Sequence, residues 1–203
     1  IRKILGRCPK KRQTIFVSAT ISREIEDLGR RFMTDPEKIV AVSGSLTVSL
    51  VQQHHLTAED WDKRRLLVHL LKQEDPPLTL VFCRMKRTVD HLTEYLNKNK
   101  ISAHAIHGDM YQSKRNAVMQ KFRDGKLSVL VASDLAARGL DVENITHVVN
   151  YDLPEDPEVY VHRIGRTARA GKGGVAWSLV TPEQGGLLTE IEKLTNTEIP
   201  VLD

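Results

Sequence analysis

The stretch LTLVFCRMKRTVDHLTEYLNKN, residues 78–99, contains the two patterns that decide the fold. Residues 78–83 form a short apolar run, which is typical of a buried β-strand. In residues 85–99 the apolar side chains of Val89, Leu92 and Leu96 recur at spacings of three and four, which predicts an amphipathic helix. The stretch therefore predicts one strand followed by one helix.

The same strand-then-helix pattern recurs along the rest of the chain. Further apolar runs, each followed by a helical pattern, occupy residues 102–107, 128–133, 146–152 and 174–180. The helices are expected at 113–125, at 135–141, from about Pro157, and at 183–196. Strands that are apolar throughout belong to a sheet covered on both faces, and successive units of this kind form parallel sheets. We predict an α/β fold, an open parallel sheet with helices on both faces and functional residues at the carboxyl ends of its strands.

The N-terminal residues have a different organisation. Strand runs at 14–20 and 38–42 enclose a helical segment at 22–33. Two strands and one helix cannot enclose a core, so we interpret this part as the tail of a preceding domain. The chain is accordingly divided into a tail, a small polar linker and a second domain, which are residues 1–43, 44–50 and 51–203.

Composition narrows the class of protein. Of the 203 residues, 40% are hydrophobic and 28% are charged, as in soluble globular proteins, and no apolar run approaches the ~18–20 residues that span a bilayer. The net charge of +4 permits a polyanionic partner without requiring one. Cys8 and Cys83 form no CxxC pair, and the seven histidines other than His162 lack metal-ligand spacing. We expect a cytoplasmic protein with no membrane partner and no metal site, and the first residue, Ile1, suggests an excised piece.

A cluster of cations lies in YVHRIGRTARAGKGG, residues 160–174. On a helix of ~100° per residue, His162, Arg166 and Arg169 fall within a stripe about 60° wide, and Arg163 lies roughly 60° outside it. Two guanidiniums one turn apart match the oxygens of a phosphate. The cluster taken alone is more typical of a solvated basic helix face.

Two further segments follow predicted strands. In HGDMYQSKR, Gly108 comes directly after a strand, and Gln112 and Arg115 open the next helix. Glycine allows a close approach of the backbone, and helix N-termini favour a phosphate, although an ordinary turn with a helix cap would have the same pattern. In SDLAARGLD, which begins at Ser133, Asp141 could accept hydrogen bonds from a ribose. The alternative there is a turn with an Asx cap.

Taken together, these segments resemble the C-terminal RecA-like lobe of the DEAD-box ATP-dependent RNA helicases of superfamily 2, preceded by the tail of the first lobe. The resemblance extends over nearly the whole chain, and five motifs occur in the family's order. The motifs are SAT (18–20), VFCR (81–84), HGDMYQSKR (107–115), SDLAARGLD (133–141) and HRIGRTARAG (162–171). The resemblance implies a RecA-like sheet and an enzyme in which ATP-driven closure of two lobes parts or remodels short RNA duplexes.

The resemblance also implies a nucleotide site. Arg166 and Arg169 are implied as arginine fingers on the γ-phosphate of ATP, beside His162 as a further catalytic residue. Gly139 and Asp141 are implied to contact the nucleotide, with Asp141 at the ribose. The cofactors would be ATP and Mg²⁺, whose ligands we expect in the first lobe.

An RNA site and a coupling role follow from the same resemblance. RNA-backbone contacts are implied for Arg84, Gly108, Gln112, Arg115, Ser133 and Asp134. Coupling between the lobes is implied for Ser18, Thr20, Arg138 and Arg163. An aromatic content of only 5% argues against base-stacking platforms, so the RNA should be bound largely without regard to sequence.

The chain departs from the family pattern at two positions and lacks two motifs. The family usually has Gly where Ala168 stands and Thr where Ser133 stands. We place Ala168 on the buried side of the helix, where Ala is favoured over Gly by up to ~1 kcal/mol. Neither GxxxxGK[ST] nor Asp-Glu-Ala-Asp occurs, so we expect the N-terminal RecA-like lobe as partner and no ATP hydrolysis by this chain alone.

Other functions stay open from the sequence. A DNA helicase or translocase of the same superfamily would carry similar motifs, and the missing first-lobe motifs would distinguish it. An RNA-binding clamp without turnover is the non-enzyme alternative, although both finger arginines are present. A dimer of the isolated piece, formed through residues 1–43, is a further alternative.

Overall fold

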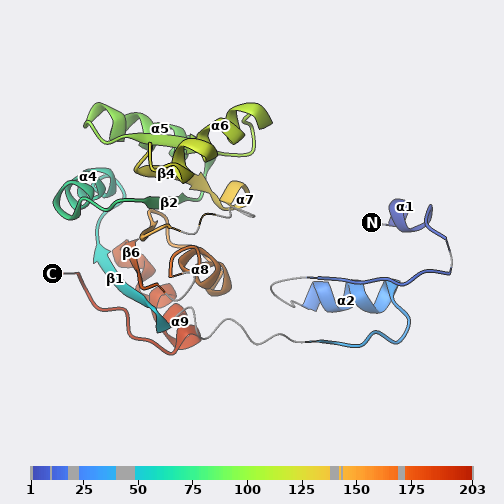
Figure 1. Ribbon diagram of the computed structural model, residues 1–203. Helices are drawn as coiled ribbons and strands as arrows, with labels where there is room; N and C mark the ends of the chain where they lie inside the picture. Colours follow the sequence, from blue (N-terminus) through green and yellow to red (C-terminus); the bar gives the residue numbers. More distant parts are fainter. Residues whose placement is uncertain are drawn as a thin grey trace. The chain divides into compact units, whose positions relative to one another are not determined.

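The computed structural model describes residues 2–9, 11–17, 23–39, 49–137, 142, 144–168 and 172–202. The chain divides into two compact units, Ile1–Val42 and Ser43–Asp203. The first is drawn in blue and the second in teal through red in Figure 1.

The described part of the N-terminal unit contains the helices α1 (Arg2–Leu5) and α2 (Arg23–Phe32). Helix α2 confirms the helix predicted there. The predicted strands are wrong in their described portions, because residues 14–17 and 38–39 have no strand geometry. A strand needs a partner for its backbone hydrogen bonds, and an apolar run alone does not supply one.

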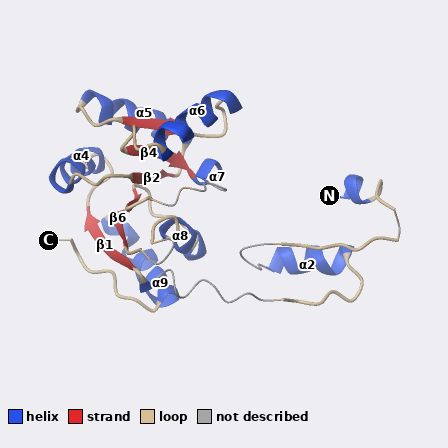
Figure 2. Cartoon of the chain, viewed as in Figure 1, coloured by secondary structure: helices blue, strands red, loops and turns tan. Residues whose placement is uncertain are grey.

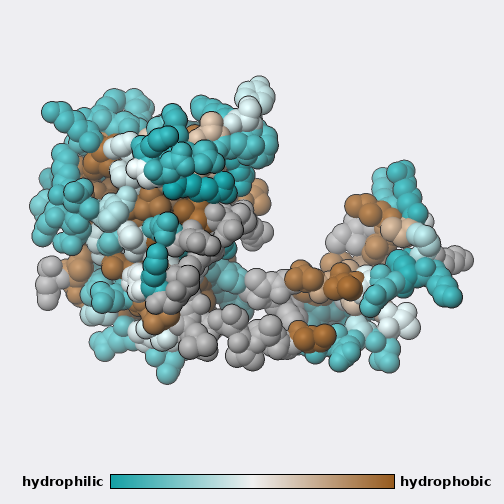
Figure 3. Space-filling view, in the orientation of Figure 1, coloured by the Kyte–Doolittle hydropathy of each residue, from teal (hydrophilic) through white to brown (hydrophobic). Residues whose placement is uncertain are grey.

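None of the described side chains in the N-terminal unit is buried. Ile15, Val17 and Ile39 are 72%, 92% and 82% exposed, and Ile4 is 69% exposed. Figure 3 shows the resulting brown, hydrophobic groups on the surface of this unit. The described residues of the unit therefore do not enclose a hydrophobic core of their own.

The C-terminal unit is a parallel sheet covered by helices (Figure 2). Its described strands are β1 (Val51–Thr57), β2 (Thr79–Cys83), β3 (Ala103–Ile106), β4 (Val129–Ser133), β5 (His147–Asn150) and β6 (Gly174–Val180). Its helices are α4 (Lys63–Glu74), α5 (Lys86–Lys98), α6 (Gln112–Arg123), α7 (Asp134–Ala137), α8 (Pro157–Ile164), the 3-10 helix η2 (Pro182–Gln184) and α9 (Gly185–Thr195). The strand order is β1-β6-β5-β2-β4-β3, and every pairing is parallel. The predicted open parallel sheet is confirmed.

Strand β1 and helix α4 were absent from the sequence prediction. β1 has the sequence VQQHHLT and lies at the edge of the sheet beside β6, so it lacks the continuous apolar run of the central strands. Helix α4 did carry a usable signal, because Leu67, Leu70 and Leu71 recur at helical spacing and are buried. The sheet therefore has one more strand than the five predicted.

The sheet buries apolar side chains on both faces because consecutive strand residues point to opposite sides. On one face Val81 and Cys83 belong to the core beneath α4 and α5. On the other face Leu80 and Phe82 pack in the core beneath α6, where Phe122 is fully buried. A third cluster joins α8 and α9 around Tyr160. Helices thus cover both faces, as predicted.

Helix α8 begins at Pro157, as predicted, but ends at Ile164. Gly165 is the C-cap, and the turn after it is anchored by the buried hydroxyl of Thr167, which donates to the backbone oxygen of Ile145 at 2.6 Å. Residues 165–168 form turns, so the prediction of one helix continuing through Arg166 is wrong. His162 and Arg166 therefore do not share one helix face, and Arg169 lies outside the described residues.

Ala168 corrects a second expectation. Its φ of 53° lies in the left-handed region, so it is not a helical residue that favours Ala over Gly. A side chain in this region costs about 1–2 kcal/mol of conformational energy. The methyl group is only 5% exposed and packs in the cluster of Tyr160 and Ile164, which offsets part of this cost.

Gly174, at the start of β6, is required by close packing. A Cβ atom there would lie 2.2 Å from Oγ1 of Thr167 and 2.8 Å from the backbone nitrogen of Ala168. Because the Thr167 hydroxyl is held by its bond to Ile145, Gly174→Ala should lower the free energy of unfolding by about 1–3 kcal/mol. Urea denaturation measures this change. Gly173→Ala, where a Cβ meets only a backbone oxygen at 3.9 Å, is the control, and equal effects of the two substitutions would contradict the packing argument.

Candidate nucleotide and RNA site

The predicted site residues that the structure describes gather at one edge of the sheet. Arg84 follows β2, Gly108 follows β3, and Ser133 and Asp134 lie where β4 ends. Asp152 follows β5 in the same way. Because all six described strands are parallel, these carboxyl ends meet at a single edge, as the sequence predicts.

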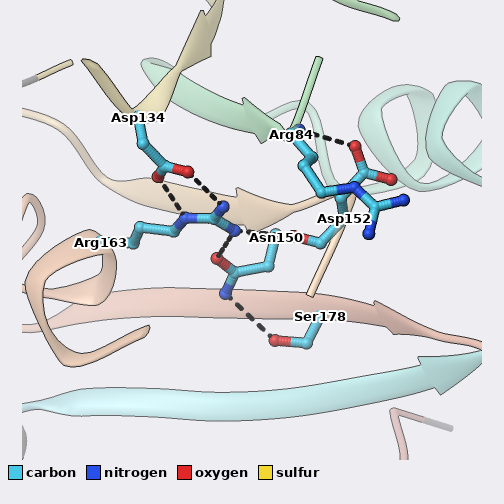
Figure 4. A network of polar contacts seen from close by, with 6 residues as sticks. All are labelled: Arg84, Asp134, Asn150, Asp152, Arg163 and Ser178. Carbon is cyan, nitrogen blue, oxygen red and sulfur yellow. Dashed lines mark hydrogen bonds and ion pairs between the residues drawn. The ribbon is translucent and has the colours of Figure 1, made fainter. Parts of the chain in front are cut away.

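Arg163 lies at the centre of a polar network at this edge (Figure 4). Its side chain is 3% exposed, and its Nε and Nη2 donate to the two carboxylate oxygens of Asp134 at 2.7 and 2.9 Å. Its Nη1 donates to Oδ1 of Asn150 at 3.1 Å and to the backbone oxygen of Asp152 at 2.7 Å. The guanidinium carbon also lies 5.0 Å from the centre of the Phe82 ring. The buried charge is thus paired and hydrogen-bonded, as burial requires.

The network extends to β6 and ties several chain segments together. Asn150 donates from Nδ2 to Oγ of Ser178 at 3.2 Å. Helix α8 is thereby connected to the ends of β4 and β5 and, through Asn150, to β6. Sequence reasoning missed Asn150 and Ser178, although a polar residue inside each apolar strand run was the available signal.

The observed contacts bear on the roles expected for Arg163 and Asp134. Both carboxylate oxygens of Asp134 are bonded to Arg163, and neither contact involves a residue outside the C-terminal unit. The pair positions helix α8 against the end of β4. The RNA contact of Asp134 and the interlobe role of Arg163 stay predictions.

Arg84 has an exposed side chain at the same edge. Its backbone N–H donates to Oδ2 of Asp152 at 2.8 Å, which holds the turn after β2 against the turn after β5. Its Nη1 lies 3.0 Å from Oε1 of Glu155, and both side chains are largely exposed. A surface pair of this kind is weak, so a competing phosphate could take the guanidinium.

The thiol of Cys83, next to Arg84, is unreactive. Burial raises the pKa of its thiol well above the usual value, and the nearby carboxylate of Asp152 raises it further. The positive charge of Arg163 opposes this shift without cancelling it. Because the thiolate is the reactive form, Cys83 serves as a core residue and not as a nucleophile.

The turn after β3 and the start of α6 also lie at this edge of the sheet. A Cβ built on Gly108 would meet nothing within 4 Å, so the space above this residue is open. Helix α6 begins at Gln112, whose Nε2 donates to Oδ1 of Asn116 at 2.8 Å. Arg115 donates from Nη2 to the backbone oxygen of Ala136 at 2.7 Å, which directs its guanidinium toward α7.

The remaining expected site residues are only partly described. His162 is a half-buried residue of the last turn of α8, and Arg166 is half-buried in the turn that follows. The other expected members lie outside the described residues, namely Ser18, Thr20, Arg138, Gly139, Asp141 and Arg169.

The described residues contain neither a metal-ligand cluster nor a membrane-spanning helix. No group of three or more His, Cys, Asp or Glu side chains in this part of the chain could hold a metal ion. Within the same residues, no helix has the length and apolar character needed to cross a membrane.

The chain is similar to known helicases along its whole length. A profile of the helicase conserved C-terminal domain family matches residues 62–171. The chain is 47% identical over 199 residues to the ATP-dependent RNA helicase CshA of Limosilactobacillus reuteri, an alignment that covers 98% of this chain and 40% of the relative. The chain thus spans about 40% of the length of the curated relatives it matches.

Solved structures agree with these sequence similarities. The E. coli DEAD-box protein SrmB, bound to regulator of ribonuclease activity A, aligns with a TM-score of 0.71 and 38% identity over 75% of this chain and 91% of that chain. S. cerevisiae Dbp5, bound to RNA and ADP BeF3, aligns with a TM-score of 0.86 and 27% identity over 98% of this chain and 53% of that chain. The predicted RecA-like fold class is confirmed.

Proposed function

Because the chain belongs to the helicase conserved C-terminal domain family, and within it to the DEAD-box proteins, we propose that it is the C-terminal part of an ATP-dependent RNA helicase. In the full-length protein, closure of two RecA-like lobes on ATP and RNA would distort the bound strand and part a short duplex. The single observation that supports this most is the gathering of Arg84, Gly108, Arg115 and Ser133 at one edge of the sheet.

On the nucleotide side, we assign Arg166 and Arg169 as arginine fingers, with His162 beside them and Gly139 and Asp141 at the nucleotide. Phosphoryl transfer is accelerated by positive charge held against the γ-phosphate. The anchoring of the turn after α8 supports this role. The network of Arg163 holds the helix before that turn, and the Thr167 hydrogen bond holds the chain behind it.

The described residues do not fit the Mg²⁺ ion that accompanies ATP in such reactions. At the site edge, both oxygens of Asp134 are bonded to Arg163, and Asp152 accepts from the Arg84 backbone N–H. These carboxylates are therefore already engaged. We propose that the metal ligands and the phosphate-binding loop belong to the N-terminal RecA-like lobe, and that the present chain alone is inactive.

On the RNA side, we assign the contacts to Arg84, Gly108, Gln112, Arg115, Ser133 and Asp134. The open space above Gly108 would admit a backbone phosphate, and Arg84 and Arg115 would contribute charge. Charge contacts of this kind do not read base identity, so binding would be largely independent of sequence.

The N-terminal unit supports the proposal that a first RecA-like lobe is the partner of the C-terminal lobe. We propose that residues 1–43 are the tail of that lobe, that residues 44–50 are a linker, and that Ser18, Thr20, Arg138 and Arg163 couple the lobes. The exposed Ile15, Val17 and Ile39 would pack against the rest of the first lobe or, in the isolated chain, against a second copy. We also propose a cytoplasmic location, with which the two free cysteines are consistent.

Duplex substrates test the proposed activity. The full-length protein should separate a short RNA duplex in the presence of ATP and should hydrolyse ATP faster when RNA is added. A DNA duplex of the same sequence distinguishes an RNA helicase from a DNA translocase. Equal turnover with RNA and DNA, or no unwinding of either, would contradict the proposal.

Arg115 offers a test of the RNA assignment. Arg115→Ala should weaken RNA binding without regard to sequence, because a phosphate contact carries no base information. The plot of log affinity against log salt concentration should become shallower by about 0.7–1 for one lost contact. The measurement is fluorescence anisotropy with two RNAs of different sequence at several salt concentrations. Lys114→Ala, at the exposed neighbouring position on α6, is the matched control, and an unchanged slope in Arg115→Ala would count against the contact.

A further inference from the structure

A cavity of about 330 Å³ lies between α4 and α5, and its lining contains none of the residues assigned to RNA or nucleotide. Its lining includes Asp60 and Trp61, which precede α4, and His91 and Tyr95 from α5. Tyr151, directly after β5, also contributes to the lining. The two helices lie close together in the C-terminal unit (Figure 1).

The lining has the composition of a protein-binding hot spot. Trp61 is a large apolar side chain that is 73% exposed, and Tyr95 and Tyr151 add two further aromatic groups. Trp, Tyr and Arg are the residues most enriched where partners bind tightly. The volume is at the low end of the ~300–1,000 Å³ range of ligand pockets, a size suited to one bulky side chain.

The charges of the lining favour a partner carboxylate. Arg64 lies with its guanidinium carbon 5.1 Å from the centre of the Tyr95 ring, and a stacked guanidinium keeps its in-plane N–H donors for an anion. The lining carboxylate, Asp60, is engaged at 2.9 Å by the ammonium of the buried Lys63. The positive charge of Arg64 is therefore not balanced by the lining carboxylate.

We propose that this cavity is a docking site for a short segment of a partner protein that inserts one bulky apolar side chain and presents a carboxylate to Arg64. The same chemistry disfavours RNA as the occupant. Platforms for single-stranded RNA combine aromatic rings with a groove of several positive charges that follows the backbone, whereas this lining contributes a single arginine, Arg64. The site does not depend on the proposed helicase activity, because it shares no residue with the RNA or nucleotide assignments.

The test uses the 203-residue chain and peptide probes of stated composition. One ten-residue peptide carries a phenylalanine flanked by aspartates, a second has lysines in place of the aspartates, and a third has alanine in place of the phenylalanine. Binding is followed by NMR through the indole N–H signals of Trp61 and Trp177. Trp177 is 2% exposed and serves as the internal reference, and Trp61→Phe assigns the two signals.

The acidic peptide should move the Trp61 signal and leave that of Trp177 in place. It should bind about fivefold more tightly than the lysine peptide, the size expected for one charge pair at an exposed rim. Arg64→Glu should reverse this preference, and Lys72→Glu, the same charge change at the exposed far end of α4, should not. The alanine peptide should not bind.

Three outcomes would overturn the proposal. The Trp61 signal could stay in place with the acidic peptide, or Arg64→Glu could behave like Lys72→Glu. A ten-nucleotide oligouridylate could instead move the Trp61 signal, which would make the cavity an RNA platform. A failure here leaves the helicase assignment intact, because that assignment is tested by unwinding and ATP turnover.

Discussion

Replacing Arg166 by alanine is expected to lower RNA-stimulated ATP turnover by about 10³–10⁵-fold in a full-length protein that carries this chain. This loss corresponds to roughly 4–7 kcal/mol of transition-state stabilisation. The reason is that the developing charge on the γ-phosphate would lose a guanidinium held in place by the anchored turn after α8. RNA affinity should change little, because Arg166 is assigned to the nucleotide and not to the RNA.

Two measurements separate these effects. ATP turnover is measured at saturating RNA, and RNA affinity is measured by anisotropy with the same preparation. Lys172→Ala is the matched control, because it removes a positive charge from the same segment, and the Lys172 ammonium donates to Oδ1 of Asn144 at 3.4 Å. Turnover of Arg166→Ala within about threefold of the wild type would rule out the finger assignment, since a finger contributes ~10³-fold or more.

Replacing Asp134 by alanine is expected to lower the free energy of unfolding by about 3 kcal/mol, because it leaves the buried Arg163 guanidinium without its counter-charge. The value is taken at the lower end for broken buried pairs, since the Asp134 side chain is 38% exposed and water could partly replace it. Urea denaturation of the chain, followed by circular dichroism, measures the change. Asp134→Asn should lower the free energy of unfolding by a smaller amount, because the amide oxygen can still accept one hydrogen bond.

Glu155→Ala is the control for the buried pair. It also removes a carboxylate from an arginine, but Arg84 and Glu155 are 61% and 80% exposed. The free energy of unfolding is expected to fall by less than about 1 kcal/mol, as for other surface ion pairs. Equal losses in Asp134→Ala and Glu155→Ala would show that burial of Arg163 does not determine the strength of its pair.

The sequence predicted those features of the fold that depend on local pattern. The central strands are apolar along their whole length, and the helices after them repeat at spacings of three and four, so the parallel sheet followed directly. The placement of Arg84, Gly108 and Ser133 at one edge followed as well, because parallel strands end on the same side. These features need no knowledge of which residues touch across the fold.

The edge strand β1 and the end of helix α8 were not predicted from the local sequence pattern. Among the described strands β1 pairs only with β6, and it contains several polar side chains, so its apolar signal is weak. Helix α8 ends at its C-cap Gly165, and the Thr167 hydroxyl bonds to Ile145, 22 residues away in the chain. This long-range hydrogen bond holds the turn in which the spacing of His162 and Arg166 had suggested a helix.

The same distinction applies to the arginine cluster. Sequence alone determined that HRIGRTARAG carries several cations suited to a phosphate and placed it after a buried strand. The tertiary structure decided that Arg163 is the buried member, with its charge taken by Asp134 from a different strand end and its remaining donors by Asn150 and Asp152. The physical reason is desolvation. A guanidinium can be buried only where partners from distant segments meet it, and those partners are brought together by the folded sheet and not by their spacing in the chain.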